Sequence, residues 1–325
     1  MATANIQESL KAGVLADLKE TWRQVVPTFQ KQQELLVKQL PFSDIRNASY
    51  PFKESLPFVK VWNYGMPRQY QTFKDRVIQL NKTPYELTIP YSRYDQIDDQ
   101  LKDMQEHVQS SVKRFAQLPD VLIAEYLNAV ADLNISLANC YDGAGLFSAT
   151  DGDGAARLGI TGGNIITGSG ISVPGVLHDI AMAQQRLLKM VDPTAGKPIF
   201  SPDEVEFSKL EIIGPNELNE IFQTASKAVM VRRDLTNNTS ESNYMAGTFI
   251  PHFNPYLTDS SDWYVAVKHA YWRPFVFRGP KDIESVMSDI SNSDRARELN
   301  EVALYSSIRC RLGPWFPGCV IKVNN

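Results

Sequence analysis

Near the N-terminus, apolar side chains recur at steps of four. They predict an amphipathic helix within residues 5–40, and Pro27 interrupts it because proline lacks the N–H of an intrahelical hydrogen bond. The next stretch, 42–57, contains prolines with serine and asparagine between them, which favours extended or turn backbone and predicts a linker. The apolar positions of the helix are Ile6, Leu10, Val14 and Leu18.

Residues 58–94 are rich in aromatic and β-branched side chains that alternate with charged ones. Such residues suit a pleated surface, so the stretch predicts two strands. Two interpretations stay open. The strands form either a long hairpin that needs another surface to lie on, because an isolated hairpin is barely stable, or part of an internal sheet. The apolar members include Phe58, Val59, Val61, Trp62, Tyr64, Phe73, Val77, Ile78, Tyr85, Leu87 and Ile89.

The clearest helical signal begins near residue 95. Apolar positions follow at steps of three and four, and acidic residues at the start suit the positive end of a helix. Pro119 interrupts or bends the pattern before the apolar run VLIAEYLNAVADL continues it. We therefore expect one long, broken helix that serves as a spine. Its first apolar positions are Ile97, Leu101, Met104, Val108, Val112 and Phe115.

Residues 142–175 contain the glycine-rich motifs DGAG, DGDG, TGG and TGSG. Glycine adopts positive φ at little cost, so these motifs predict turns and exposed loops. Neither the order of a phosphate-binding loop nor that of a dinucleotide-binding loop is present, and no lysine follows. The run DGDGAARLG resembles the start of a calcium loop, but Ala155 stands at the third ligand position and no glutamate closes the loop. We expect neither a cofactor nor a metal here.

After Pro174 the pattern alternates between helix, strand and helix. Apolar positions predict a helix over residues 176–190, the run LEII predicts a strand, and residues 216–228 predict a second helix with Asn216 as its N-cap. This alternation is typical of a compact α/β domain.

The polar, asparagine-rich stretch 231–246 predicts an exposed loop. Beyond it, strand-forming residues alternate with turn signals to the C-terminus, and the segment IESVMSDI is ambiguous. The predicted strand segments are GTFIPHFNPYL, DWYVAVKHAYW, RPFVFRG and ALYSSIRCRLGPWFPGCVIKVNN.

Composition places the chain in the ordinary globular range. Its 325 residues, 43% hydrophobic and 22% charged, allow one large or two modest cores. A net charge of -4 lacks the basic footprint of a protein that grips nucleic acid. The N-terminal sequence shows no signal peptide and no stretch is long enough to span a bilayer, so we expect a soluble, cytoplasmic protein without a membrane partner.

Cysteine and histidine give no sign of catalysis. The three cysteines, Cys140, Cys310 and Cys319, are odd in number and form no CxxC, so we expect free thiols and no disulfide. The four histidines are scattered, and His178 directly precedes Asp179 instead of following a facial-triad spacing. Nucleophile-elbow, HExxH and Walker motifs are also missing from the sequence, so we expect no enzyme and no small-molecule substrate.

The order of segments along the chain resembles the Mu-like major head subunit family and, more broadly, capsid proteins with the Hong Kong 97-like fold. No single piece is diagnostic, and the similarity rests on the co-linear order over most of the chain. The stretches that carry it are LPFVKVWNYGMPRQYQTFKDRVIQLNKTPYELTIPYSRYDQIDDQL, LPDVLIAEYLN, CYDGAGLF, GKPI, LEIIGPNELNEIF and FNPYLTDSSDWYVAVKHAYWRPFVFRG.

The resemblance implies an α+β capsid fold and the function of a tailed-bacteriophage major capsid protein. Such a subunit self-assembles through hexamers and pentamers into an icosahedral shell around double-stranded DNA, in the host bacterial cytoplasm. The implied divisions are an N-terminal arm (1–49), an extension loop (50–94), a peripheral domain with the spine helix (95–141), an axial domain (142–258) and returning β segments (259–325).

The implied partners are other copies of the chain, with portal and scaffolding or decoration proteins and non-specific contact to packaged DNA. Some capsids of this fold cross-link a lysine of the extension loop to a neighbour, but Lys53, Lys60, Lys74 and Lys82 stand in no distinctive context and we assign no cross-link. The candidate inter-subunit residues are Trp62, Arg68, Lys74, Asp75, Arg76, Arg232, Arg233 and Asp234.

Two alternatives stay open at this point. An encapsulin-like compartment has the same fold but encloses cargo enzymes in place of DNA, and sequence separates the two poorly. The other alternative is an enzyme whose site lies in the glycine-rich residues 142–175, although no set of general acid and base residues is evident there.

Overall fold

The computed structural model describes residues 20, 36–40, 47–53, 61–67, 75–92, 101–133, 136–192, 196–232, 240–268, 272–279, 284–287, 298 and 301–325. Its three main helices are α3 (Leu101–Asn128), α4 (Val173–Lys189) and α5 (Asn219–Lys227). The strands are β1 (Val37–Gln39), β2 (Asn47–Lys53), β3 (Asp75–Asn81), β4 (Thr83–Ser92), β5 (Ile165–Thr167), β6 (Leu210–Gly214), β7 (Met230–Arg232), β8 (Ser240–Ser242), β9 (Ile250–Phe253), β10 (Trp263–Val267), β11 (Phe275–Arg278), β12 (Glu284–Met287), β13 (Glu301–Pro314) and β14 (Val320–Asn324).

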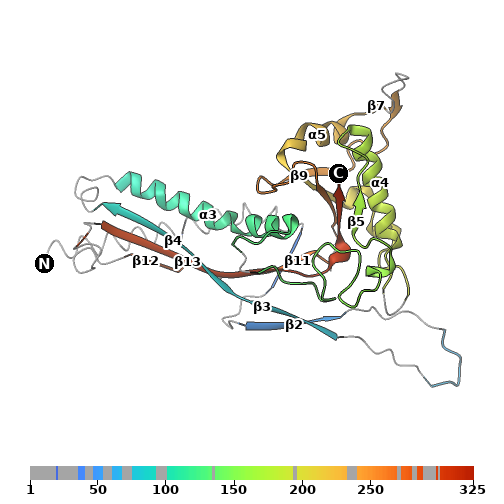
Figure 1. Cartoon of the computed structure of the whole chain (residues 1–325), viewed down its shortest axis with the longest axis horizontal. Coiled ribbons are helices and arrows are strands. Elements are labelled where there is room, and N and C mark those ends of the chain that lie inside the picture. Colours follow the sequence, from blue (N-terminus) through green and yellow to red (C-terminus); the bar gives the residue numbers. More distant parts are fainter. Residues whose placement is uncertain are drawn as a thin grey trace.

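The elongated part of the molecule is a sheet built on β13, with α3 lying along one face (Figure 1). Strand β4 pairs with β13 over its whole length, from Thr83 opposite Cys310 to Ser92 opposite Glu301. Strands β12 and β11 pair antiparallel with β13, and β1 joins β11 in parallel. From residue 83 to residue 90 of β4, odd positions are half-buried and even positions are exposed, so the sheet has one apolar face for the helix.

Helix α3 runs through Pro119 as a single element. The predicted spine helix is therefore confirmed over Leu101–Asn128, and the break at Pro119 is not seen. Pro119 is tolerated because the apolar side chains on both sides of it are buried in the same core. Those buried side chains are Val112, Phe115, Leu118, Leu122, Ile123, Tyr126 and Leu127.

The compact part contains a second sheet, in the order β5-β14-β10-β6-β9. Its central strands β6 and β10 are buried along their whole length. Trp263 and Val265 of β10 belong to one core cluster, and the intervening Tyr264 and Ala266 belong to the other. Helices α4 and α5 cover the first face (Figure 1). The second face meets α3, where the Tyr264 hydroxyl donates a hydrogen bond to the Leu127 carbonyl oxygen at 2.8 Å. Burial on both sides explains the continuous apolar run of β10.

The α/β alternation predicted after Pro174 is confirmed, with one difference at a helix start. Helix α4 begins at Val173, where the side chain of Ser172 accepts a hydrogen bond from the Gly175 amide. Asn216 is not the N-cap of the second helix. It opens a short 3-10 turn, Asn216–Leu218, and α5 follows with Leu218 at its N-cap. Pro215 fixes the backbone for that turn, which takes the place of a side-chain cap.

Three other local predictions change. The predicted helix within residues 5–40 lies mostly outside the described residues, but its end is strand β1, because Val37 is buried where it pairs with Phe275. The predicted linker 42–57 contains β2, which forms a hairpin with β3. The predicted loop 231–246 has strands β7 and β8 at its two ends, and residues 233–239 lie outside the described part. Long-range pairing overrides the local signal in each case.

None of the helices in the described segments is long and apolar enough to cross a membrane.

The three cysteines are free thiols buried in the subunit. Burial raises the pKa of Cys140 and of Cys310 to about 12, and raises the pKa of Cys319 as well. Because the thiolate is the reactive form, these side chains are poor nucleophiles while the chain is folded.

We expect iodoacetamide at pH 8 to modify the folded protein about a thousandfold more slowly than the urea-unfolded chain, since both thiolate formation and access are suppressed. Mass mapping under non-reducing conditions should find all three thiols free. A bridged pair, or equal rates in the folded and unfolded states, would contradict this.

Candidate assembly surfaces

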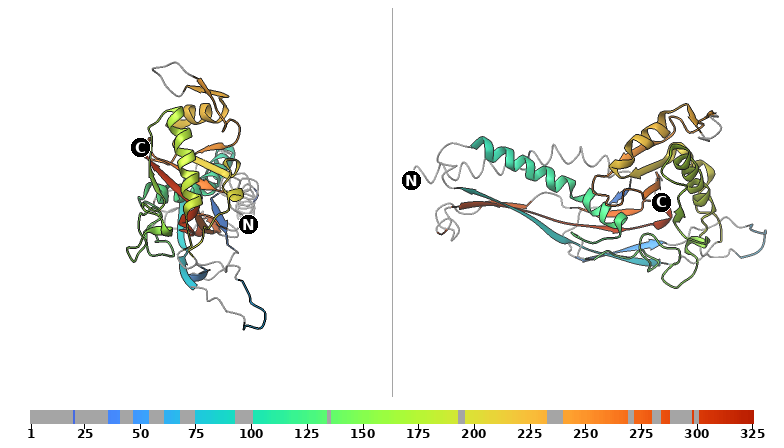
Figure 2. Two further views of the ribbon diagram at one scale, coloured as in Figure 1. Left: turned by 90° about the vertical axis from the view of Figure 1, so that its right-hand side faces the viewer. Right: turned by 45° about the horizontal axis from the view of Figure 1, so that its top comes forward.

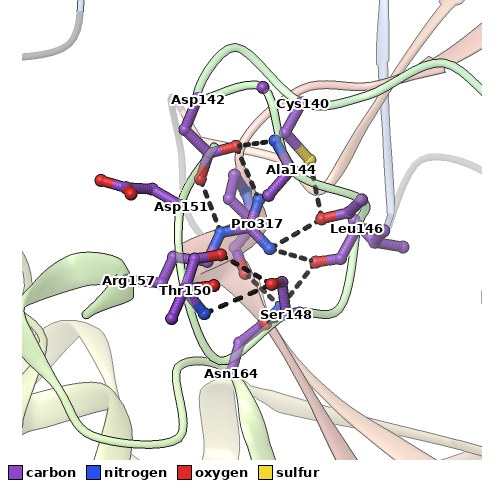
Figure 3. Close-up of polar contacts among 12 residues, drawn as sticks. Cys140, Asp142, Ala144, Leu146, Ser148, Thr150, Asp151, Arg157, Asn164 and Pro317 are labelled. Carbon is purple, nitrogen blue, oxygen red and sulfur yellow. Dashed lines mark hydrogen bonds and ion pairs between the residues drawn. The ribbon is translucent and has the colours of Figure 1, made fainter. Parts of the chain in front are cut away.

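The glycine-rich region is folded around a buried ion pair (Figure 3). Arg157 Nε lies 2.6 Å from Asp142 Oδ2, and Arg157 Nη2 donates to Asp142 Oδ1 at 2.9 Å. Arg157 Nη1 donates to the carbonyl oxygens of Gly145 and Leu146 at 2.8 and 2.9 Å. The guanidinium is therefore committed to the protein's own backbone and carboxylate, and it offers no charge to a ligand.

Asn164 ties the same region to the end of the chain. Its Nδ2 donates to the carbonyl oxygens of Leu146, Pro317 and Val320 at 2.9, 3.2 and 3.2 Å. Gly163 next to it has φ +53°, and a Cβ there would collide with a backbone carbonyl oxygen. The glycines predicted to form turns thus serve close packing of the loops.

Ser169, His178 and Asp179 lie together but do not form a catalytic triad. Ser169 Oγ lies 3.0 Å from His178 Nδ1, and Asp179 Oδ1 lies 3.5 Å from the same nitrogen. A triad needs the serine and the carboxylate on opposite ring nitrogens. The Asp179 carboxylate instead accepts the backbone N–H of Ser169 at 2.9 Å. In the part of the chain that the structure describes, no three His, Cys, Asp or Glu side chains are placed to hold a metal ion.

The predicted extension loop is anchored at its base in the subunit's own fold. Ile78 and Leu80 of β3 are buried in a core cluster, and Arg278 Nη1 donates to the Leu80 carbonyl oxygen at 3.4 Å. The next strand, β4, belongs to the sheet of β13. The hypothesis that both strands of residues 58–94 depend on a neighbour for their order is therefore wrong for residues 75–92. Strand β4 follows the internal-sheet alternative, and β3 forms a hairpin with β2 that packs on the subunit's own core.

The segment 61–67 beyond that base is exposed at every residue. Val61 and Tyr64 are 94% and 96% exposed, and Trp62 and Met66 are more than half exposed. The Trp62 indole N–H donates to the Met66 carbonyl oxygen at 2.8 Å, and the Trp62 and Tyr64 rings contact edge to face, with centroids 6.1 Å apart. We call these four side chains the extension tip. Clustered exposed apolar side chains mark a surface that another molecule covers.

A second exposed apolar group lies at the far side of the compact part. Its members, here called the axial tip, are Val229, Met230 and Tyr244 around the hairpin of β7 and β8. Figure 2 shows this hairpin and the blue segment 61–67 projecting from the body in opposite directions. The two groups therefore expose apolar side chains at two separate places on the surface.

The structure separates the candidate inter-subunit residues into three groups. Trp62 is in the extension tip. Arg76 is half-buried in β3 and lies opposite Phe52 in the β2–β3 hairpin. Asp75 lies opposite Lys53 in the backbone register at the end of the same hairpin. Arg232 is the last residue of β7. The candidates outside the described residues are Arg68, Lys74, Arg233 and Asp234.

Sequence reasoning favoured charged residues near both tips. It included Trp62 of the extension tip but missed the other apolar members of the two tips. In the extension tip the signal was the run VWNYGM, in which large apolar residues surround the turn residue Gly65. In the axial tip no local signal distinguishes Met230 or Tyr244 from a core residue.

The family of the chain follows from comparison with known proteins. A family model described as "Mu-like prophage major head subunit gpT" matches residues 8–170, about half of the chain. The chain belongs to this family. It is a major capsid protein of the tailed-phage type and not an enzyme, in agreement with the implied function. No curated protein matches the sequence.

Solved phage capsid structures share the fold of this Mu-like head subunit. The procapsid of bacteriophage JBD30 has a TM-score of 0.51 at 14% identity, over 98% of this chain and 75% of that chain. A capsid of an empty GTA particle has a TM-score of 0.56 at 9% identity, over 89% and 88% of the two chains. The capsid of cyanophage P-SCSP1u gives 0.52 at 11% identity, over 90% and 87%. The expected α+β, Hong Kong 97-like fold is confirmed.

For a Mu-like head subunit, the polar groups of the glycine-rich region are structural. Their hydrogen bonds satisfy backbone carbonyl groups of the loops, which would otherwise be buried without a partner. The alternative of an enzyme with its site in this region is not favoured.

Replacing Arg157 with Met should lower the free energy of unfolding by about 3–5 kcal/mol, because Asp142 would stay buried without its partner. The matched control is Arg309→Met. Arg309 lies 2.9 Å from Glu284, with the two side chains 61% and 66% exposed, so its loss should cost no more than about 1 kcal/mol.

Urea unfolding of unassembled protein, followed by circular dichroism, measures both variants. Equal losses in the two variants would show that the buried pair has no special role in the fold.

Proposed function

We propose that the chain builds the shell of a phage head by assembling through pentamers and hexamers into an icosahedral particle around double-stranded DNA. The observation that carries this proposal is the extension tip, whose apolar side chains are exposed on a segment that projects from the body of the subunit (Figure 1). Many modest contacts of this kind, repeated by symmetry, add up to a strong shell.

We propose a role for each of the segments that the family resemblance implies. Residues 50–94 form an extension loop that is anchored by β3 and β4 and reaches a neighbour through its tip. Residues 142–258 form an axial domain whose tip meets other copies around the axis of a capsomer. Residues 1–49 form an arm, and residues 95–141 and 259–325 supply the peripheral platform. Exposed apolar area at both tips supports contacts in two directions.

Charged side chains near the tips are proposed to set the register of these contacts. Like charges brought together at an interface oppose wrong pairings, while opposite charges speed the correct encounter. The residues assigned this role are Arg68, Lys74, Asp75, Arg76, Arg232, Arg233 and Asp234.

The remaining partners are proposed on general grounds. A portal and scaffolding or decoration proteins complete a phage head, and assembly takes place in the host cytoplasm. Contact with packaged DNA is proposed to be non-specific and weak, because the chain carries a net charge of -4 and phosphate binding needs clustered basic residues.

Replacing both Val61 and Tyr64 with Ser should abolish closed shells and leave unassembled subunits or capsomers. Both side chains are almost fully exposed, so the free energy of unfolding of the subunit should change by no more than about 0.5 kcal/mol. Negative-stain images and size-exclusion chromatography report assembly. The control is Tyr305→Ser, which removes an exposed aromatic side chain from the middle of β13. Normal shells from the tip variant would refute the role of the tip.

Limited proteolysis should cut unassembled protein within residues 61–67 and spare the same bonds in shells, since exposed backbone is what proteases reach. Cutting should not extend to Ile78 and Leu80, because these side chains are buried in the subunit itself. Equal cutting of free and assembled protein within 61–67 would mean that no neighbour covers the tip.

A further inference from the structure

A cleft of about 280 Å³ lies where α3 meets the edge of the compact sheet. One wall is α3, from which Gln117, Asp120 and Ile123 contribute at steps of three and therefore share one face of the helix. Strands β6 and β9 and the segment after β9 form the opposite wall. The other lining residues are Leu36, Glu211, Ile213, His252, Phe253, Asn254, Pro255 and Tyr256.

Hydrogen bonds fix the two walls relative to each other. Asn254 Nδ2 donates to the Asp120 carbonyl oxygen at 3.2 Å, and Asn254 Oδ1 accepts the Tyr256 N–H at 3.0 Å. The Tyr256 hydroxyl donates to Gln117 Oε1 at 3.4 Å. The Asn254 amide thus links the two walls of the cleft. The cleft is therefore formed before a ligand enters it.

The cleft carries uncompensated negative charge. Glu211 Oε2 is paired with His252 Nε2 at 2.7 Å. The Asp120 carboxylate has no hydrogen-bond or ion-pair partner among the described residues, and no lysine or arginine is among the residues that line the cleft. Burial raises the pKa of Asp120 to about 6, which expresses the cost of holding this carboxylate ionised without a partner.

We propose that this cleft binds a protonated alkylamine, with the ammonium group against Asp120 and the alkyl chain along Ile123, Ile213 and Phe253. Among the described residues, neither a hydrogen-bond donor nor a cation pairs with the Asp120 carboxylate. An ammonium group supplies three donors and a positive charge. An apolar wall beside the charge favours an amphipathic cation over a hydrated metal ion. Asp120, Glu211 and His252 are also not placed to hold a metal ion together.

The amine has two possible sources with one chemistry. It is either a free alkylamine or the side chain of a lysine from another copy of the chain. The proposed site is the same in both cases. A comparison of free subunits with assembled shells distinguishes the two sources.

The binding should depend on pH in a defined direction. Ammonium binding needs the ionised carboxylate, so affinity is full above the Asp120 pKa and falls as pH drops through about 6. The other ionisable side chains that line the cleft are Glu211, His252 and Tyr256. At pH 5 affinity should be about tenfold lower than at pH 7.5.

Isothermal titration of the full chain with n-butylamine at pH 7.5 tests the proposal, with n-butanol as the uncharged ligand of similar shape. Butylamine should bind saturably and butanol should not. Asp120→Asn should weaken butylamine binding at least tenfold. It should leave the unfolding midpoint unchanged or higher, because it removes an unpartnered buried charge. Asp153→Asn, on an exposed loop, is the matched control and should bind like the wild type.

Titration of assembled shells identifies the source. Binding by free subunits but not by shells means that a lysine of a neighbouring copy fills the cleft, and binding by both means a free amine. The proposal is overturned if the wild type binds no butylamine at pH 7.5, or if Asp120→Asn binds it equally well. The comparison of pH 7.5 with pH 5 uses the wild type alone, and equal affinity at the two values overturns the proposal without any variant.

Discussion

The pairing of β4 with β13 is the interaction on which the rest of the molecule depends. All ten residues of β4 find partners on β13, although the two strands lie far apart in the sequence. This ladder provides the apolar face on which α3 is buried. The chain then leaves β13 through a short turn and enters β14, between β5 and β10 of the compact sheet, so the C-terminal segment joins both parts. Contacts between strands so far apart in the sequence are expected to form slowly during folding.

The two sheets of the subunit are largely covered by the subunit's own elements. The central strands of the compact sheet are buried on both faces, and the sheet built on β13 is covered by α3 on one face. Strand β4 is paired on one edge only within the described strands, but it carries Pro84 and Pro90, which lack the N–H that open-ended strand addition needs. The prolines thus oppose strand addition at this edge, while the two tips expose clustered apolar side chains.

A few charged side chains of the described residues are largely buried. Arg157, Asp142 and Asp179 are turned inward, where they hold loops and a helix start, and their hydrogen bonds are made within the subunit. Asp120 in the cleft beside α3 differs from these residues. Its carboxylate is largely buried and has no hydrogen-bond or ion-pair partner among the described residues. A buried carboxylate without a partner in its own chain is unfavourable for folding. For this reason we propose that the partner of Asp120 comes from outside the subunit.

The sequence by itself determined the elements whose signal is local. The periodicity of apolar residues gave α3 and α4, the run LEII gave β6, and the glycine motifs gave turns. Only the tertiary structure decided that Val37–Gln39 and Asn47–Lys53 are strands, that residues 75–92 belong to the subunit's own fold, and that Met230 and Tyr244 are exposed. Strand pairing and exposure depend on residues distant in the sequence, and a local pattern of apolar residues is the same whether the partner is the subunit's own core or a neighbouring copy.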